Sequence, residues 1–475
     1  MNKGEGNTTG SKKRTFWNFI DNIEGDKVVW IIVFMLLMIS ALAIFSSTST
    51  LTDDGRSRVD LFKTHSMFIA GGLGLMWLLY KIKSIRFFRR ISQLGFFASL
   101  ALLVILDFNI NLGFLKADTI NDATRSLKLF NSVQIHVFEF VKVAMVMYLA
   151  WALDAYRTDQ ECIKEGRKSS TFRWYYKLVK WIRSKHDAPA LDNAIWKRIF
   201  YIYLPVALIT ILSKPGSNSS MLFIGGVSMI ILWIGKMPLK ELALIILTGI
   251  IGLASLIGIH YISGGRCFKD MRIDTLISRV TDDSDIYKLI RIEEDPKQGK
   301  YSKEWYAVRG KIKQPYTATI AIRQGGIIGK GSGNSTQKYI VTHIYSDYIF
   351  SLIVEEYGLA GGIVIIMLFV TLLARGAMIA RWCQNDFAKY AVGGLSFMIC
   401  AQAFMHIMVN VDIGVLTGQT LPLISDGRSA FIMFCIAFGI ILSISKIARK
   451  QKLAEEAELE REEAEKLALE ESQRS

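Results

Sequence analysis

Residues 28–46 read VVWIIVFMLLMISALAIFS, a run of nineteen residues without a charged side chain. At about 1.5 Å of rise per residue, a helix of this length approaches the roughly 30 Å thickness of the hydrocarbon core of a bilayer. The 27 residues that precede the run are mostly polar or charged, and no small-residue cleavage site follows it. The run therefore predicts a retained transmembrane helix and not a removable signal peptide.

Similar apolar runs occur along most of the 475-residue chain, of which 51% is hydrophobic. Length alone would allow two or three soluble domains, but runs of spanning length exclude that class. The sequence predicts an all-α integral membrane protein with ten transmembrane helices. The predicted spans are 28–46, 65–82, 91–108, 133–153, 197–213, 219–236, 240–262, 346–375, 388–411 and 427–447.

Outside the long loop at 263–345, lysine and arginine are concentrated in alternate loops between the predicted spans. Lys12, Lys13 and Arg14 precede the first span, and basic clusters separate the second span from the third and the fourth from the fifth. Because short translocated loops avoid these residues, both termini are predicted to be cytoplasmic. The net charge of +15 suits contact with anionic membrane lipid, so no nucleic-acid partner is predicted.

This topology divides the chain into a cytoplasmic N-terminal segment at 1–27, a membrane domain at 28–447 and a charged cytoplasmic tail at 448–475. Two long loops interrupt the membrane domain: a basic cytoplasmic loop at 154–196, and a large extracytoplasmic loop at 263–345 between helices seven and eight. The tail is rich in Ala, Glu, Leu and Lys at helical spacing, which predicts an exposed or self-pairing helix.

Cysteine and histidine patterns indicate neither a disulfide framework nor a metal site. Of the five cysteines, only Cys267 is expected to face outward, so it has no outward partner. The six histidines lack the spacing of metal ligands. We therefore predict no bound metal and no other cofactor.

The large outward loop contains two unusual stretches. RIEEDPKQGKYSKEW, residues 291–305, carries nine ionisable side chains in fifteen residues, and it indicates chemistry or binding on a lipid-linked polar substrate at the outer membrane face. GGIIGKGSGNSTQK, residues 325–338, contains five glycines and is called the glycine loop below. It lacks the spacing of a nucleotide-binding loop. Two interpretations stay open, a phosphate-binding row of backbone N–H groups and a re-entrant turn.

Ionisable residues inside the predicted spans are costly and therefore point to function or to buried pairs. Glu139 and Lys142 lie three residues apart, so they share one helix face and can neutralise each other. Glu355 and Glu356 lie on the eighth span.

Several segments resemble the SEDS family (shape, elongation, division and sporulation proteins). The glycine loop with its continuation YIVTHIYSDYIFSLIVEEYGLAGG is similar to the start of the family's eighth span, and GQTLPLISDG at 418–427 to the start of its tenth. NDATRSLKLF at 121–130 and RIDTLISRV at 272–280 resemble the second outer loop and the arginine segment after span seven. The spacing from the glycine loop to span eight resembles the division branch, FtsW, more than the elongation branch, RodA.

The resemblance implies an inverting peptidoglycan glycosyltransferase that polymerises lipid II at the outer face of the bacterial inner membrane, for cell wall biogenesis at the division septum. Implied partners are lipid II, a class B penicillin-binding protein, other divisome proteins and membrane lipid. Two alternatives stay open: a flippase or transporter of the lipid-linked precursor, and a catalytically weak scaffold for the penicillin-binding protein.

The resemblance also implies roles for individual residues. Asp295, which precedes a proline as the family's acid often does, is the expected catalytic base, and Glu304 is the alternative because it lies closer to the family's spacing. Cations near the leaving pyrophosphate would be Arg272, Arg279, Arg125 and Lys142. The substrate-binding residues implied by the resemblance are Arg125, Glu139, Lys142, Arg272, Arg279, Gly333, Asn334, Ser335, Gln337, Lys338, Asp347 and Ser425.

Some positions depart from the family pattern. Ser126 stands where the family usually has tryptophan, and Ser-Tyr-Gly-Gly of the family becomes Ser-Asp-Gly-Arg at 425–428. Either the substrate groove has been rebuilt, with Asp426 and Arg428 as a possible pair, or activity has been reduced and a scaffold role remains.

Overall fold

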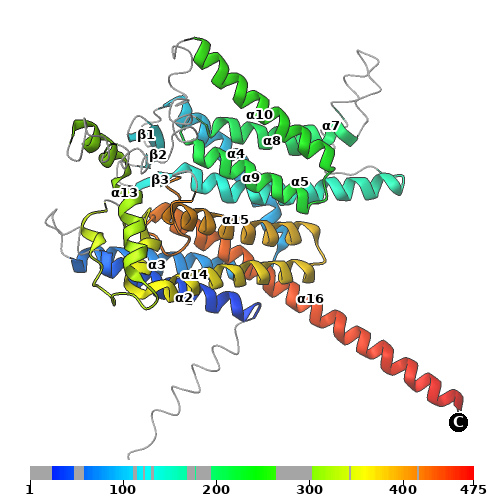
Figure 1. Cartoon of the computed structure of the whole chain (residues 1–475). Helices are drawn as coiled ribbons and strands as arrows, with labels where there is room; N and C mark the ends of the chain where they lie inside the picture. The colour runs from blue at the N-terminus through cyan, green and yellow to red at the C-terminus, as the bar shows by residue number, and fades with distance from the viewer. Residues whose placement is uncertain are drawn as a thin grey trace, which may run out of the picture.

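The structure is a computed structural model that describes residues 24–47, 58–110, 115–120, 123–129, 133–167, 177, 194–214, 216–263, 292, 302–341, 344–413 and 417–474. These residues form a bundle of long helices with a small β-sheet near one end, and helix α16 projects from the other end (Figure 1).

Each of the ten predicted spans overlaps a helix in the described part of the chain. The helices are α2 (Lys27–Ser47), α3 (Arg58–Tyr80), α4 (Ile85–Asp107), α5 (Val137–Lys164), α7 (Ala194–Arg198), η3 (Ile199–Tyr203), α8 (Leu204–Leu212), α9 (Asn218–Ile234), α10 (Leu239–Ile262), α13 (Lys303–Gly325), η5 (Gln337–Tyr339), α14 (Ile349–Trp382), α15 (Asp386–Asn410) and α16 (Arg428–Arg474). Among the described residues, seven helical stretches are long and apolar enough to cross a membrane, and α7, η3 and α8 together supply one of them. The fold is a multi-span helical membrane fold, while the number of ten spans stays a prediction.

Polar capping residues fix where several helices begin. Asp26 Oδ1 accepts hydrogen bonds from the amides of Val28 at 2.9 Å and Val29 at 3.2 Å, which satisfies two N–H groups at the start of α2. Asn385 caps α15 by accepting from the amide of Ala388 at 3.2 Å. These caps set the ends of two helices that the apolar runs alone locate only approximately.

A small sheet, which the sequence did not predict, accompanies the helices. Its strands β1 (Leu115–Ile120), β2 (Ala123–Leu129) and β3 (Val133–His136) pair antiparallel in that order. The predicted fourth span was wrong at its start, because residues 133–136 pair with β2 and α5 begins only at Val137.

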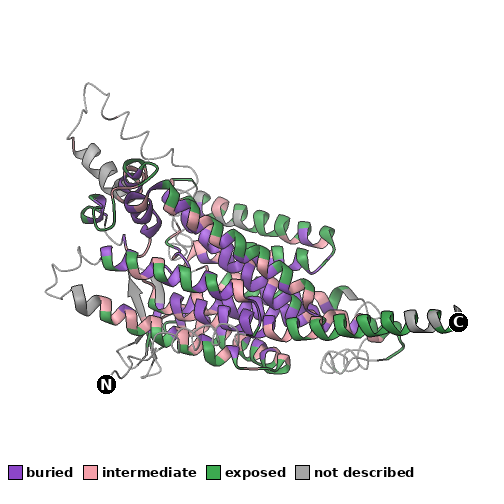
Figure 2. Cartoon of the chain, turned by 90° about the horizontal axis from the view of Figure 1, so that it is seen from below, coloured by how far each residue is buried: buried purple, intermediate pink, exposed green. Residues whose placement is uncertain are grey.

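Helices α5 and α15 lie at the centre of the bundle. Residues 141–155 of α5 are all buried, and α15 packs against both α5 and α14. Buried residues gather in the middle of the bundle (Figure 2). A helix that is apolar around its whole circumference is expected in such a position. Polar side chains on these two helices therefore need partners inside the protein.

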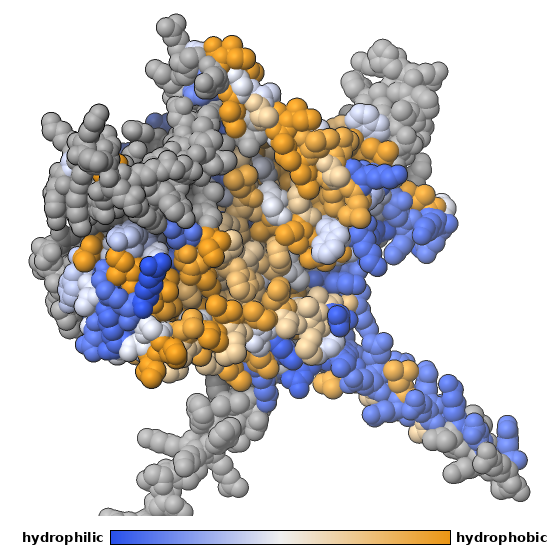
Figure 3. All heavy atoms as spheres, viewed as in Figure 1, coloured by the Kyte–Doolittle hydropathy of each residue, from blue (hydrophilic) through white to orange (hydrophobic). Residues whose placement is uncertain are grey.

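Apolar side chains also cover much of the face of the bundle seen in Figure 3, and hydrophilic residues gather on the projecting part of α16. Met38, Leu94, Ile211 and Met367 are each more than half exposed. An apolar outer surface of this extent is typical of helices that face lipid. Helix α16 continues from its apolar part to Arg474 without interruption, and residues 453–466 are exposed, as predicted for a helical tail.

Candidate functional site

Helix α14 is broken at Gly358, which adopts φ 71° and ψ −175°. A break leaves backbone N–H and C=O groups without partners in the helix, which is costly inside a membrane. The glycine loop supplies the missing partners. Its bonds to α14 are Lys330 N to Glu355 O at 3.0 Å, Gly331 N to Glu356 O at 2.9 Å, Leu359 N to Gly326 O at 2.9 Å and Ala360 N to Ile327 O at 3.2 Å.

Two glycines allow the loop and the helix to approach this closely. A Cβ at Gly329 would lie 2.3 Å from the carbonyl oxygen of Glu356, and a Cβ at Gly358 would lie 2.2 Å from that of Ile327. Both glycines also have a positive φ, of +90° and +71°, which side-chain-bearing residues rarely adopt. The contact between loop and helix therefore requires glycine at both positions.

We expect Gly329→Ala to lower the free energy of unfolding by about 2 to 3 kcal/mol, because the new methyl group meets backbone at a strained φ. The matched control is Gly226→Ala, since a Cβ at Gly226 on α9 meets nothing within 4 Å. Thermal melting of the detergent-purified proteins measures the difference. Equal melting midpoints for the two variants would show that the loop does not pack closely against α14 at Gly329.

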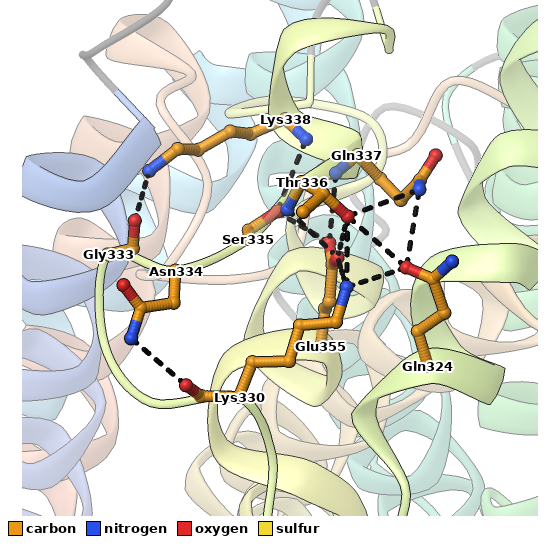
Figure 4. Close-up of polar contacts among 9 residues, drawn as sticks. All are labelled: Gln324, Lys330, Gly333, Asn334, Ser335, Thr336, Gln337, Lys338 and Glu355. Atoms are coloured by element: carbon orange, nitrogen blue, oxygen red, sulfur yellow. Dashed lines mark hydrogen bonds and ion pairs between the residues drawn. The ribbon is translucent and has the colours of Figure 1, made fainter.

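The glycine loop folds around the carboxylate of Glu355, which is fully buried on α14 (Figure 4). Lys330 Nζ donates to Oε1 at 2.6 Å, and Ser335 Oγ donates to Oε2 at 2.5 Å. Thr336 donates to Oε1 from its amide and from its hydroxyl, each at 3.0 Å, and the amide of Gln337 donates to Oε2 at 3.4 Å. The anion enclosed by this loop is therefore a carboxylate of the protein itself.

This geometry favours one of the two interpretations of the glycine loop. The amides of Lys330 and Gly331 bond to carbonyl groups of α14, and the amides of Thr336 and Gln337 bond to Glu355. These N–H groups are used within the protein and do not form a row directed at a phosphate. The loop is a turn fastened to α14, which favours the second interpretation, and its depth in the membrane stays a prediction.

Further contacts of the loop reach α2 and close the turn on itself. Lys338 Nζ donates to the carbonyl of Gly333 at 2.7 Å and lies 3.5 Å from the carbonyl of Ser46, near the end of α2. Asn334 Nδ2 donates to the carbonyl of Lys330 at 3.0 Å. The structure brings together five of the predicted substrate-binding residues, which are Gly333, Asn334, Ser335, Gln337 and Lys338. Their contact with a substrate stays a prediction.

We expect Glu355→Gln to lower the free energy of unfolding by about 2 kcal/mol, because it removes the charge that Lys330 and three other donor residues share. The matched control is Glu356→Gln on the same helix, where the amide oxygen can still accept from the Ser46 hydroxyl. Thermal melting again gives the comparison. If the Glu355→Gln protein is as stable as the control, the Glu355 carboxylate does not hold this cluster together.

A second polar cluster surrounds Lys142 on α5, whose side chain is buried. Its Nζ donates to Glu139 Oε1 at 2.7 Å, to Gln402 Oε1 at 2.9 Å and to Gln419 Oε1 at 2.6 Å. An ammonium group has three N–H donors, and these bonds use all three. The predicted pairing of Glu139 with Lys142 is confirmed. The cluster joins α5 to α15 and to the segment before α16.

Gln402 and Gln419 were not among the predicted site residues. Gln402 could have been noticed as a buried amide within an apolar span, and Gln419 as a member of the GQTLPLISDG segment. Their common partner could not be found in this way, because Gln402 and Gln419 lie 260 and 277 residues from Lys142 along the chain.

The turn before α14 contacts the segment before α16. Ser425 Oγ donates to the carbonyl of Ser346 at 2.8 Å, and Ser346 Oγ donates to Asp347 Oδ1 at 3.0 Å. The carbonyl of Asp347 accepts from Asn410 Nδ2 on α15 at 3.1 Å. The predicted residues Ser425 and Asp347 therefore lie close together, where the turn before α14 meets the segment before α16.

Asp426 has a different neighbour from the one suggested by the sequence. Its carboxylate lies 3.7 Å from His65 Nδ1 on α3, and the Arg428 guanidinium lies 5.5 Å from the ring centre of Phe68 on the same helix. The proposed pairing of Asp426 with Arg428 is replaced by contacts of each with α3. Burial, and then the nearby carboxylates, raise the pKa of Tyr345, whose carbonyl accepts from the Asp426 amide at 3.0 Å.

Residues 26–450 match the family model of the FtsW, RodA and SpoVE cell cycle proteins. The chain belongs to this family, the SEDS family. A SEDS relative from Xanthomonas oryzae pv. oryzae, "Probable peptidoglycan glycosyltransferase FtsW", is 28% identical over 385 residues. The match covers 80% of this chain and 65% of the relative, so the chain spans less than two thirds of that protein's length.

Two solved structures share the SEDS fold. One, described as "Structural coordination of polymerization and crosslinking by a peptidoglycan synthase complex", has a TM-score of 0.58 at 18% identity and covers 89% of this chain and 97% of its own. The other is the rod shape determining protein RodA of Thermus thermophilus, with a TM-score of 0.51 at 17% identity, covering 90% and 98%. At these identities the likeness shows the fold alone. The resemblance to the SEDS family that the sequence suggested is confirmed.

The remaining predicted SEDS site residues lie partly or wholly outside the described structure. Asp295, Arg272 and Arg279 fall outside the described residues, and nothing is described of the side chains of Glu304 on α13 and Arg125 on β2. Their roles stay predictions.

Proposed function

We propose that the chain is a peptidoglycan glycosyltransferase that polymerises lipid II into glycan strands at the outer face of a bacterial cytoplasmic membrane. Membership of the SEDS family and the name of the Xanthomonas relative support the activity. The structural observation that carries the proposal is the buried Lys142 cluster, in which one cation is fixed by Glu139, Gln402 and Gln419 from three separate segments. An ionisable group inside a helical membrane protein is costly, which supports a functional role for this cluster.

In the proposed reaction, a carboxylate of the outward loop takes the proton from the 4-hydroxyl group of an acceptor GlcNAc. The freed oxygen attacks C1 of the lipid-linked MurNAc with inversion, and the bond from C1 to the pyrophosphate breaks. Undecaprenyl pyrophosphate leaves with the electron pair, and nearby cations offset its negative charge. Because Lys142 uses its three donors within the protein, we assign this contact to Arg272, Arg279 and Arg125.

We further propose that the chain serves septal wall synthesis together with a class B penicillin-binding protein and other divisome proteins, with both termini in the cytoplasm. One solved structure of the same fold is described as that of a peptidoglycan synthase complex for polymerization and crosslinking, which supports a partner of this kind. The FtsW name of the Xanthomonas relative supports the division role. Septal enrichment of a fluorescent fusion tests this role, and uniform side-wall labelling would favour elongation.

Supplying lipid II to the purified protein, with and without its penicillin-binding partner, tests the activity directly. Glycan strands on a gel are the expected product. If the protein makes no strands but moves lipid II across vesicle bilayers, the flippase alternative replaces the polymerase.

The scaffold alternative is favoured by one specific observation, the contact of Asp426 with His65 where the family has an uncharged tyrosine. It predicts tight binding of the penicillin-binding protein together with little polymerisation at any partner ratio. Substantial strand formation by the complex would exclude it.

A further inference from the structure

A pocket of about 410 Å³ lies at the end of the bundle where α2 begins and α14 ends. Residues 449–456 of α16, where this helix continues into the tail, form another wall. Four cationic side chains line the pocket against two acidic ones, so its lining has a formal charge of +2. The cations are Lys27, Arg375, Arg449 and Lys452, and the acids are Asp26 and Glu456.

The carboxylate of Asp26 is neutralised within the protein. Asp26 is 2% exposed, caps α2 through Oδ1 and accepts from Arg375 Nε through Oδ2 at 2.9 Å. Its amide donates to Ser445 Oγ on α16 at 3.1 Å. Asp26 and Arg375 therefore form a local pair that holds α2, α14 and α16 together.

Arg449 and Lys452 are the cations with capacity for a further ligand. Arg449 donates to the carbonyl of Gly25 at 2.8 Å, which uses one of the five N–H donors of a guanidinium. Lys452 lies 3.1 Å from Glu456, and since the two side chains are 43% and 50% exposed, this pair is weak. Both cations lie on one stretch of α16 that passes the pocket.

The position of the pocket indicates the class of anion. Helices α2 and α14 are both long and apolar enough to span a membrane, so their ends lie near the membrane surface. Trp382 lies between two cations, 5.2 Å from Lys452 Nζ and 5.7 Å from Arg375 Cζ, as is typical of tryptophan at such a surface. Basic pockets between helix ends at this level suit phosphate groups, which an arginine can bind through two N–H groups at once.

We propose that this pocket binds the phosphate group of an anion at the membrane face, with Arg449 and Lys452 as its ligands. The bound phosphate links the start of the tail to α2 and α14. Both an anionic phospholipid and a soluble phosphate ester carry this chemistry, and the membrane position favours the lipid. The proposal is independent of the polymerase activity.

Binding of phosphatidylglycerol to the full-length, delipidated protein in detergent tests the proposal, with native mass spectrometry and thermal melting as readouts. Phosphatidylcholine and glycerol 3-phosphate are the comparison ligands. The variant R449Q/K452Q removes both proposed ligands, and R461Q/K466Q removes two charges from the exposed part of the same helix.

Phosphatidylglycerol is expected to bind the parent and R461Q/K466Q alike, and at least tenfold more weakly to R449Q/K452Q. If R449Q/K452Q melts at a lower temperature than the parent without lipid, Arg449→Lys takes its place in the test. This variant keeps the charge and should retain part of the binding. Binding of glycerol 3-phosphate alone, with the same loss in R449Q/K452Q, would support the phosphate site and assign it to a soluble ester. Equal phosphatidylglycerol binding by all variants would overturn the proposal.

Discussion

Replacing Lys142 with methionine is expected to lower polymerisation of lipid II by at least about 10²-fold. The change leaves the partly buried Glu139 carboxylate and two glutamine oxygens without their shared donor, which should also lower the free energy of unfolding by about 3 kcal/mol. Loss of the cluster frees α5, α15 and the segment before α16 to shift relative to one another. The rate of lipid II consumption and the melting midpoint are the two measurements.

Two further variants separate the structural effect from the functional one. Lys164→Met makes the same change in the exposed last turn of α5 and should leave both quantities unchanged. The double variant E139Q/K142M removes the orphaned charge, so it should melt above K142M but stay inactive. Recovery of full activity in the double variant would mean that the cluster acts only through stability.

Asp295→Asn is expected to lower the polymerisation rate by about 10² to 10⁴-fold, because asparagine cannot accept the proton of the attacking hydroxyl. Binding of lipid II and of the penicillin-binding protein should change little, since the side chain keeps its size and its polarity. The rate at saturating lipid II is the quantity to measure.

Glu304→Gln is the control for the assignment of the base. If Asp295 is the base, Glu304→Gln should retain most of the parental rate. The reverse result, with Glu304→Gln inactive and Asp295→Asn active, would transfer the role to Glu304. If both variants polymerise like the parent, the base lies elsewhere in the chain.

Features set by local sequence could be predicted, and features set by distant contacts could not. The apolar runs located the helices, and the three-residue spacing of Glu139 and Lys142 identified a pair on one helix face, because helical geometry fixes both. The partners Gln402 and Gln419 come from distant parts of the chain, and no local pattern specifies them.

The sheet and the glycine loop show two other limits. Strands β1 to β3 are short and lie between spans, so their alternation was hidden within a segment taken for a loop and a helix start. The five glycines of the glycine loop suit close approach to any oxygen, whether of a phosphate or of a helix carbonyl. The break at Gly358 exposes helix carbonyls to the loop and so favours the second kind of partner. A glycine inside an apolar run does not by itself predict such a break.

Because α16 is one continuous helix, its projecting part should move rigidly with its membrane part. Its last 25 or so residues extend about 38 Å beyond the apolar part at 1.5 Å per residue. A tilt of about 10° in the membrane part would swing the tip by roughly 7 Å, by this same geometry. A protein bound at the tip would therefore be displaced by small tilts of the membrane part of α16.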